Sequence, residues 1–388
     1  DFNDANEVQW KIATSSGPVT LIFDVPLNAV TNIDLGARFR VGTVQDQVDQ
    51  ATGFAMDGEV EDYLVQVKGL DYGDLPDFFA GVSTGDYQTN YANNGPRHGV
   101  PATPQLFLGA VIDVDADGQP DLGAGEDGTG GDDNDGVATG DDEDGVVGPP
   151  MIFRGEEASF AVTLNLTNLT GTTAYVYGYI DWNGNGILGD TPAEIASGSS
   201  AASGPITLIF NVPLGAVANN NLGARFRVGS VESQVNVPNG FAMDGEVEDY
   251  LVRVKGLDFG DLPLPYATLD AQDGPRHAVS EVPQVYLGST IDIDDDGQPD
   301  ADAGELNGGD DGDATGGDDE DGVIEPAMIS RAGIANFTVS VVNQSANTAY
   351  VYGYIDWNND GNFDDANEVQ FATVNPNTST DLILSFNV

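Results

Sequence analysis

The chain repeats itself, and this repetition constrains its fold more than any other feature of the sequence. Three motifs recur in the same order: DGEVEDY at 57–63 and 244–250, GPRH at 95–98 and 274–277, and AYVYGYIDWN at 174–183 and 349–358. Their spacings define a unit of about 180 residues. The 388 residues hold about two such units plus a short overlap, since FNDANEVQ at 2–9 matches FDDANEVQ at 363–370.

One part of the unit alternates apolar and polar residues with the period of a β-strand. In its most complete copy, residues 147–255, Phe160 and Val162 alternate with polar neighbours, and Tyr175 and Tyr177 share one face of another run. Such runs, separated by Gly, Pro and Asn turns, are typical of a β-sandwich. We therefore expect an all-β protein, in which tandem sandwiches of immunoglobulin-like or jelly-roll type alternate with acidic, glycine-rich connectors.

The phase of the repeat divides the chain into five segments. Residues 147–255 hold a complete sandwich, and residues 70–146 and 256–323 are the two connectors. Residues 1–69 hold the later part of a sandwich, and residues 324–388 hold the earlier part of another. Neither partial sandwich can bury both of its faces, and each would leave open strand edges, which proteins avoid.

Each partial sandwich therefore needs a complement, and two arrangements provide one. The polypeptide continues with the same repeat in a longer chain, or neighbouring subunits complete each other's sandwich by strand addition, head to tail. The duplicated segment at 2–9 and 363–370 favours the longer chain, because a strand-complemented joint would carry that element twice. In both arrangements the predicted partners are copies of the same repeat.

The connectors end in acidic, glycine-rich tracts. Residues 113–144 contain 13 acidic residues and residues 292–321 contain 14, and neither tract contains a basic residue. A formal net charge of −52 opposes a compact fold unless something neutralises it. Like-charged blocks are usually disordered, solvating linkers. Here Asp and Gly recur at fixed phase in both copies, which favours ion coordination instead.

The most specific acidic pattern is Asp-x-Asp-x-Asp-Gly, which occurs once in each connector. Carboxylates at its first, third and fifth positions converge when the backbone wraps, and the glycine permits the sharp turn, as in the first half of an EF-hand loop. Oxygen donors without His or Cys favour Ca²⁺ over transition metals, so we predict calcium as the cofactor. The predicted ligands are Asp113, Asp115, Asp117 and Asp121 in one copy and Asp292, Asp294, Asp296 and Asp300 in the other.

A second pair of candidate calcium loops lies inside the sandwiches. The first contains Asp181, Asn183 and Asn185, with Asp190 and Glu194 as later oxygen donors. The second contains Asp356, Asn358 and Asp360, followed by Asp364, Asp365 and Glu368. The alternative is an Asn/Gly hairpin turn that binds no metal.

Two further acidic clusters are candidates for cation binding. Glu59 and Glu61 share one face of a predicted strand and repel each other unless Arg38 or calcium lies between them; Glu246, Glu248 and Arg225 repeat this pattern. The run at 131–146 and its second copy resemble an additional oxygen-rich site. Its candidate ligands are Asp132, Asp133, Asp135, Asp141, Asp142 and Asp144, with Asp310, Asp311, Asp318, Asp319 and Asp321 in the second copy.

Several classes of function are disfavoured by what the sequence lacks. The absence of cysteine excludes disulfides, zinc–thiolate sites and a cysteine nucleophile. There is no HExxH motif, and the glycine-rich stretches are too crowded with carboxylates to bind phosphate. Without a basic patch, nucleic acid and anionic membranes are poor partners, and no apolar run is long enough to span a bilayer. We do not expect an enzyme. The scarce arginines and the two GPRH histidines, His98 and His277, are more consistent with internal structural contacts.

The motifs DGEVEDY, DYGDLP, GPRH, GGDDEDGV and YIDWNNDGNFDDANE together resemble the GEVED-domain repeats of bacterial secreted and surface proteins. In those repeats a β-sandwich that ends in GEVEDY alternates with a connecting module. The resemblance covers nearly the whole chain. It implies an extracellular, multi-repeat, calcium-bound protein, and it assigns no catalytic residue.

The sequence therefore predicts a calcium-stabilised extracellular structural repeat protein that forms a fibre, a filament or a cell-surface stalk. A protein without disulfides needs another means of stabilisation, which bound metal can supply. We expect a secreted, cell-surface location without membrane insertion in this segment. The alternative is a cell-surface adhesin that binds glycan on a calcium-rigidified stalk. Its candidate sugar-stacking residues are Tyr175, Tyr177, Tyr179 and Trp182, although core packing explains them more simply.

Overall fold

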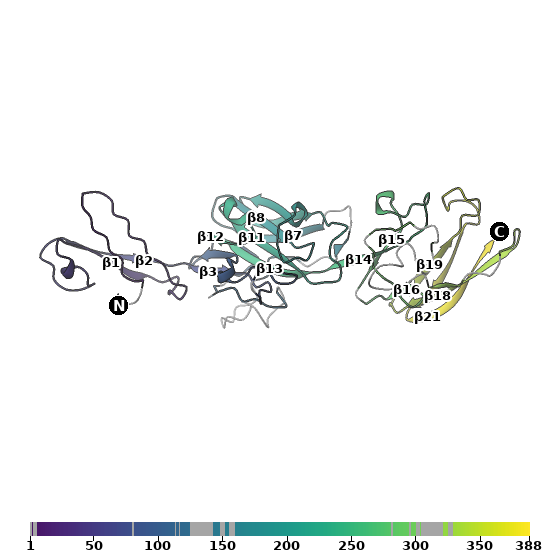
Figure 1. The fold of residues 1–388 in the computed structure, drawn as a ribbon, viewed down its shortest axis with the longest axis horizontal. Helices are drawn as coiled ribbons and strands as arrows, with labels where there is room; N and C mark the ends of the chain where they lie inside the picture. Colours follow the sequence, from purple (N-terminus) through teal and green to yellow (C-terminus); the bar gives the residue numbers. More distant parts are fainter. Residues whose placement is uncertain are drawn as a thin grey trace.

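The computed structural model describes residues 2, 6–79, 81–112, 114–115, 117–124, 143–147, 152–154, 160–280, 282–294, 296–299, 303, 321–324 and 329–388. The described residues form three bodies in a row along one long axis, and the two ends of the chain lie at opposite ends of this row (Figure 1). We call residues 6–66 the first body, residues 69–252 the middle body and residues 254–388 the third body.

The first body is built on a single hairpin. Strands β1 (Leu35–Val41) and β2 (Glu59–Val65) pair antiparallel, with Leu35 opposite Val65 and Val41 opposite Glu59. The short helix η1 (Gln45–Gln47) lies in the loop between them. Residues 8–34 contain no strand, and their large apolar side chains, such as Trp10 and Ile22, are exposed.

The middle body is a sandwich of two antiparallel sheets. One sheet has the order β13 (Glu246–Val252), β11 (Leu222–Gly229), β8 (Ala174–Ile180) and β9 (Ile195–Ser200). The other has the order β10 (Gly204–Phe210), β7 (Phe160–Asn168) and β5 (Leu106–Leu108). Their inner faces bury Leu164, Val176, Leu208, Phe210 and Phe226, as the period-2 pattern predicts.

Connector strands cover and extend this sandwich. Strand β5 comes from the first connector and pairs with β7. Strands β3 (Gly69–Tyr72) and β4 (Arg97–Val100) form a small sheet with β12 (Phe241–Ala242). Connector and sandwich thus share one packed body, and β11 is buried on both faces because its arginine face lies beneath the connector. The remaining short elements here are η2 (Tyr91–Asn93), β6 (Ile152–Phe153), η3 (Pro192–Glu194) and α1 (Glu232–Val235).

The third body repeats most of this arrangement. Strand β18 (Ile334–Asn343) pairs with β16 (Val285–Leu287), β17 (Val323–Ile324) and β21 (Thr378–Asn387), and β19 (Ala349–Tyr354) pairs with β20 (Val369–Val374). Their core contains Val339, Val351, Val374 and Phe386. Strand β14 (Val254–Phe259) pairs with β15 (Arg276–Val279) and, in parallel, with β6, while η4 (Asp270–Gln272) lies in the connector.

The expected all-β fold class is confirmed by these sheets. Strands at the same position in the repeat correspond to each other: β5 to β16, β7 to β18, β8 to β19, β9 to β20 and β10 to β21. The sequence counterparts of β11 and β13 are β1 and β2 of the first body. A search of the described residues for a helix with the length and apolarity needed to cross a membrane finds none.

Candidate metal-binding loops and the connector interface

The loop after β8 gathers the five oxygen-bearing side chains that the sequence groups at 181–194. The Oδ1 and Oδ2 atoms of Asp181 accept hydrogen bonds from the backbone amides of Asn185 (3.1 Å) and Gly186 (2.8 Å). The Asn183 amide donates to Asp190 (3.2 Å) and Glu194 (3.0 Å), and the Asn185 amide donates to Asp190 (2.8 Å). The loop thus closes on its own polar side chains.

Negative charge is concentrated and partly buried in this loop. Asp181 and Glu194 are both completely buried. Burial, together with the neighbouring carboxylates of Asp190 and Asp181, raises the pKa of Glu194 to about 7. Burial also raises the pKa of Asp181, whereas hydrogen bonds led by the Asn185 amide lower the pKa of Asp190. A nearby positive charge would favour the ionised form of Glu194 and offset this rise in its pKa.

The corresponding loop of the third body has the same construction. Asp356 accepts a hydrogen bond from the backbone amide of Gly361 (2.9 Å). The Asn358 amide donates to Asp360 (3.3 Å) and to Asp365 (2.5 Å), and the backbone amide of Asp365 donates to Glu368 (3.1 Å). Asp365 therefore takes the place of Asp190.

The predicted ligand Asp364 is placed differently from its neighbour Asp365. Its backbone amide donates to the side chain of Asn362 (3.0 Å), whereas the Asp365 carboxylate accepts from Asn358; both residues are exposed. The structure thus groups Asp365, rather than Asp364, with Asn358 and Glu368. The two later acids are adjacent in sequence, so spacing alone did not distinguish them.

A tyrosine from the preceding connector contacts the first carboxylate of each loop. The Tyr87 hydroxyl donates to Asp181 Oδ2 at 3.0 Å, and the Tyr266 hydroxyl donates to Asp356 Oδ2 at 2.9 Å. Tyr87 and Tyr266 occupy the same repeat phase, two residues before Thr89 and Thr268. Sequence reasoning missed both tyrosines, although the shared phase is visible once the GPRH motifs are aligned.

The Asp-x-Asp-x-Asp-Gly segments accept hydrogen bonds from backbone amides in the earlier part of their own connector. Asp115 accepts a hydrogen bond from the backbone amide of Tyr72 at 3.0 Å, and Asp117 accepts one from that of Tyr91 at 2.6 Å. The second copy repeats both contacts, with Asp294 accepting from Phe259 and Asp296 from Asp270, each at 2.7 Å. Asp121 accepts from the amide of Leu122, and Asp292 is partly buried.

Many of the predicted ligands of the acidic tracts lie outside the described residues. Asp144 and Asp321 are described, and they accept hydrogen bonds from the backbone amides of Ala110 (2.8 Å) and Ser289 (2.9 Å). Within the described ranges, no group of three or more Asp, Glu, His or Cys side chains stands in position to hold a metal ion. The residues outside are Asp113, Asp132, Asp133, Asp135, Asp141, Asp142, Asp300, Asp310, Asp311, Asp318 and Asp319.

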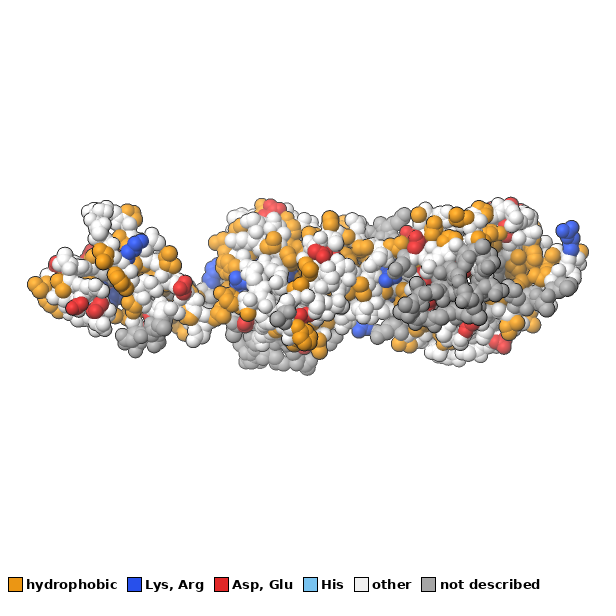
Figure 2. Space-filling view, in the orientation of Figure 1, with side chains coloured by type: hydrophobic (Ala, Val, Ile, Leu, Met, Phe, Trp, Pro, Cys, Tyr) orange, Lys and Arg blue, Asp and Glu red, His pale blue; other side chains and the backbone are white. Residues whose placement is uncertain are grey.

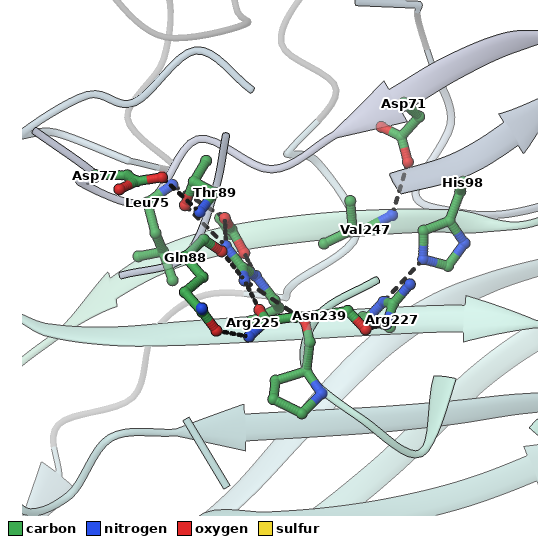
Figure 3. A network of polar contacts seen from close by, with 12 residues as sticks. Asp71, Leu75, Asp77, Gln88, Thr89, His98, Arg225, Arg227, Asn239 and Val247 are labelled. Atoms are coloured by element: carbon green, nitrogen blue, oxygen red, sulfur yellow. Dashed lines mark hydrogen bonds and ion pairs between the residues drawn. The ribbon is translucent and has the colours of Figure 1, made fainter. Parts of the chain in front are cut away.

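The acids of the second DGEVEDY motif bind the connector through its backbone. Glu246 accepts a hydrogen bond from the amide of Leu108, and Glu248 accepts one from the amide of Gly145 (2.9 Å). In return, the amide of Val247 donates to Asp71 at 2.8 Å (Figure 3). The sequence left arginine and calcium as alternatives for the paired glutamates. In the middle body both glutamates accept backbone hydrogen bonds, and Glu248 also accepts one from the Tyr250 hydroxyl (3.3 Å).

Arg225 joins the strand and the connector through a buried ion pair. Its guanidinium donates two hydrogen bonds of 2.7 Å to Asp249, and both side chains are fully buried. It also donates to the backbone oxygen of Gln88 (2.9 Å) and to Thr89 Oγ1 (3.1 Å), which lie on the connector (Figure 3). The expected internal role of this arginine is confirmed.

Arg227 and His98 form a second buried contact across the same interface (Figure 3). Arg227 Nε donates to His98 Nε2 at 3.0 Å, and His98 Nδ1 lies 2.9 Å from the backbone oxygen of Asp244, to which it donates. Burial holds the pKa of His98 well below its usual value, and the Arg227 charge lowers it further. His98 is therefore a neutral hydrogen-bonding group. Its counterpart His277 is exposed.

Residues 81–85 match Gly-x-Ser-x-Gly, a sequence found around nucleophilic serines. That motif requires a sharp turn between a strand and a helix. Ser83 instead lies in a surface turn, where it exchanges two backbone hydrogen bonds with Asp86. The motif therefore lacks the structural context of a nucleophile elbow.

The two loops gather carboxylate and amide oxygens, and the interface fixes the connector against the sandwich. A family model of the GEVED domain matches residues 1–66 and 175–253, which correspond to the first body and to most of the middle sandwich. Neither the curated proteins nor the solved structures contain a significant match to the chain.

Proposed function

Because the chain is a GEVED-domain repeat protein, with two copies of that domain, we propose that it is a calcium-stabilised extracellular structural protein. In this proposal the repeats form the shaft of a fibre, a filament or a cell-surface stalk. The observation that carries it is the repeated junction in which a connector tyrosine contacts an acidic sandwich loop, Tyr87 with Asp181 and Tyr266 with Asp356.

The chemistry of the two sandwich loops supports calcium. Carboxylate and amide oxygens are the donors that Ca²⁺ prefers, and extracellular calcium modules bind it at ~10⁻⁴–10⁻³ M. Bound calcium would neutralise charge at Asp181, Asp190 and Glu194. Asn183 and Asn185 would turn their amide oxygens towards the same centre, in place of their present hydrogen bonds to the carboxylates. Tyr87 would then hold Asp181 in position from the connector side.

The same ion would also stiffen the junction between connector and sandwich. The connector is attached to the sandwich by Arg225 and Arg227 and by three acids of the DGEVEDY motif, Glu246, Glu248 and Asp249, all of which are buried. A metal that fixes Asp181 also fixes the Tyr87 hydroxyl. Rigid junctions repeated along a chain produce an extended rod, and the described bodies lie in a row (Figure 1).

Thermal unfolding of the 388-residue chain with calcium, with magnesium and with EGTA tests the proposal. Each site at ~100-fold saturation adds ~2.7 kcal/mol, and several sites add roughly in proportion. We expect the midpoint to rise clearly in calcium and little in magnesium, which prefers a small octahedral site that keeps its waters. Equal midpoints in calcium and EGTA would overturn the calcium assignment. Electron microscopy of the calcium-loaded protein tests the fibre, and dispersed single particles at high concentration would contradict it.

Glycan binding is a second candidate function, favoured by exposed aromatic rings on the third body. Tyr352 stacks on Tyr354 and on Phe371, with ring centroids 6.2 and 5.3 Å apart, and all three side chains are at least half exposed. In the middle body the corresponding Tyr179 is buried, as is Trp182. Calorimetric titration with soluble polysaccharides tests this adhesin role, which requires saturable binding that a Tyr352→Ala variant loses.

A further inference from the structure

The middle body and the third body meet where strand β13 passes into strand β14. Strand β13 ends at Val252, and β14 begins at Val254. Both valines are buried in the core of the middle sandwich. Strand β14 then continues into the second connector, where Gly256 lies opposite Val279 (Figure 1). We call residues 252–254 the joint, and the strand that leaves it begins inside the core of the preceding unit.

The backbone of Val254 is held by two segments of the middle sandwich. Ile152 of β6 lies opposite Val254 in a parallel pair, and Ala218 forms a parallel bridge with it. The backbone amide of Asn219 also donates to the backbone oxygen of Val254 at 2.8 Å. Ile152 is itself buried in the same core. The first residue of β14 is therefore fixed to the sandwich that precedes it.

Arg154, which directly follows β6, connects the middle sandwich to the second connector. Its Nε donates to the backbone oxygen of Ala216 at 2.6 Å, and its Nη1 donates to the backbone oxygen of Asp294 at 3.0 Å. Ala216 is buried in the middle sandwich, and Asp294 is buried in the second connector. Basic side chains, which are scarce in this chain, lie where the two bodies meet in Figure 2. One guanidinium bridges both bodies because its planar fork presents several N–H donors in fixed directions.

Asp294 in turn binds strand β14, which completes a closed ring of contacts. Its backbone amide donates to the backbone oxygen of Leu257 at 2.8 Å, and its carboxylate accepts from the backbone amide of Phe259 at 2.7 Å. The ring runs from the sandwich along β14 to Asp294 and returns to the sandwich through Arg154. Bending at the joint must stretch or break a hydrogen bond of this ring, whereas a single strand without it could bend freely.

We propose that Arg154 is a clamp that fixes the orientation of the third body on the middle body. Domains of one chain usually move relative to each other unless their interface restrains them. Here only Arg253 separates the two strands, and Arg154 closes the ring beside it. The inference goes beyond the proposed fibre function, because it names the contact that sets the direction from one unit to the next, and it does not require bound calcium.

Distance measurements between two spin labels test the clamp, since the chain contains no cysteine of its own. Ser199→Cys on β9 and Thr373→Cys on β20 place labels at exposed, equivalent positions of the middle and third bodies. Double electron–electron resonance then reports the distribution of distances between the two bodies. We expect a narrow distribution in the labelled parent and its loss in Arg154→Ala. Distributions of equal width in the two proteins would overturn the proposal.

Two further variants separate the geometry of the clamp from its charge. Arg276→Ala is the matched control, because Arg276 contacts Asp270 and the backbone oxygen of Gly274 within the second connector, and it should keep the narrow distribution. Arg154→Lys keeps the positive charge but lacks the planar fork that bridges two carbonyl groups, so the distribution should broaden. A narrow distribution in Arg154→Lys, or equal broadening in Arg276→Ala and Arg154→Ala, would contradict the clamp.

Hydrogen exchange distinguishes a loosened joint from a damaged sandwich. In Arg154→Ala the backbone amides of Asn219 and Phe259, whose acceptors are Val254 and Asp294, should exchange faster than in the wild type. The amides of β11, in the middle of its sheet, should keep their protection. Unchanged exchange at the joint would overturn the proposal. Faster exchange throughout β11 would overturn it as well, because Arg154 would then support the sandwich as a whole.

Discussion

The hydroxyl of Tyr87 donates a 3.0 Å hydrogen bond to Asp181 and accepts a 2.7 Å hydrogen bond from the backbone amide of Gly223. One buried oxygen thereby connects the first connector, the acidic loop and strand β11. Tyr266 repeats the contact with Asp356 one unit later. The repetition indicates that this hydroxyl is part of the way the unit is built.

Tyr87→Phe should therefore destabilise the middle body. The change removes a hydrogen bond to a buried carboxylate and leaves the Gly223 amide without its acceptor, for which we expect a loss of ~1.5–3 kcal/mol. Urea unfolding measures this loss. Tyr91→Phe is the matched control, because Tyr91 lies on the same connector with a more exposed ring, and it should change stability by less than ~0.5 kcal/mol. Equal effects of the two substitutions would argue against the role of the Tyr87 hydroxyl.

Glu194→Gln should have opposite effects with and without calcium. Ionised Glu194 is buried beside Asp190 and Asp181, and its pKa is raised to about 7. In EGTA at pH 8 the neutral amide removes this repulsion, so the melting temperature should stay equal or rise. In calcium the variant loses a charged donor, so the calcium-induced rise should shrink. Glu232→Gln, on the surface helix α1, should leave both melts unchanged. A full calcium response in Glu194→Gln would exclude this residue as a ligand.

The two equivalent arginine–aspartate pairs should contribute very different amounts to the free energy of unfolding. Arg225→Ala leaves Asp249 buried without its cation, and breaking such a pair costs ~3–5 kcal/mol. Arg38→Ala breaks the identical pair with Asp62 in the first body, where both side chains are exposed to solvent, and should cost less than ~1 kcal/mol in unassembled chains. Urea unfolding at low protein concentration compares them. Similar losses would show that burial is not what distinguishes the pairs.

Stability should fall as the pH drops below about 6.5 because of His98. The unfolded chain takes up a proton on this residue near pH 6.5, whereas the folded chain resists protonation because the pKa of His98 is lowered by burial. Because the unfolded state then binds more protons than the folded state, the free energy of unfolding should fall by up to ~1.4 kcal/mol for each pH unit of acidification. Glu194 has the opposite effect in metal-free protein: its pKa is raised in the folded state, so acidification towards pH 5 increases the free energy of unfolding.

Comparing the wild type with the His98→Gln variant separates the pH dependence of stability that comes from His98 from the part that comes from the carboxylates. The glutamine can still accept the hydrogen bond from Arg227, and it does not titrate. Urea unfolding at pH 7.5, 6.5 and 5.5 should show the wild type losing stability relative to the variant. Parallel pH profiles would contradict a neutral, buried His98.

Much of the architecture follows from local patterns. The period-2 runs at AYVYGYI, LGARFRV and EVEDYLV predict strands, and β8, β11 and β13 are found there, because alternation of apolar side chains is a property of each segment alone. The grouping of Asp181, Asn183 and Asn185 likewise follows from their spacing of two residues in one turn.

What no local pattern contains is the environment that distant segments create. LGARFRV is the same sequence at 35–41 and at 222–228, yet only the second copy is buried on both faces, since a connector more than 100 residues earlier in the chain packs on its arginine side. The partners of Asp181 and Glu248, supplied by Tyr87 and Gly145, come from the same connector. The sequence by itself determined the repeat, the acidic loops and the strands of the complete sandwich. The tertiary structure decided which copies are buried and what each carboxylate contacts, because burial and desolvation depend on the segments that pack together rather than on their own residues.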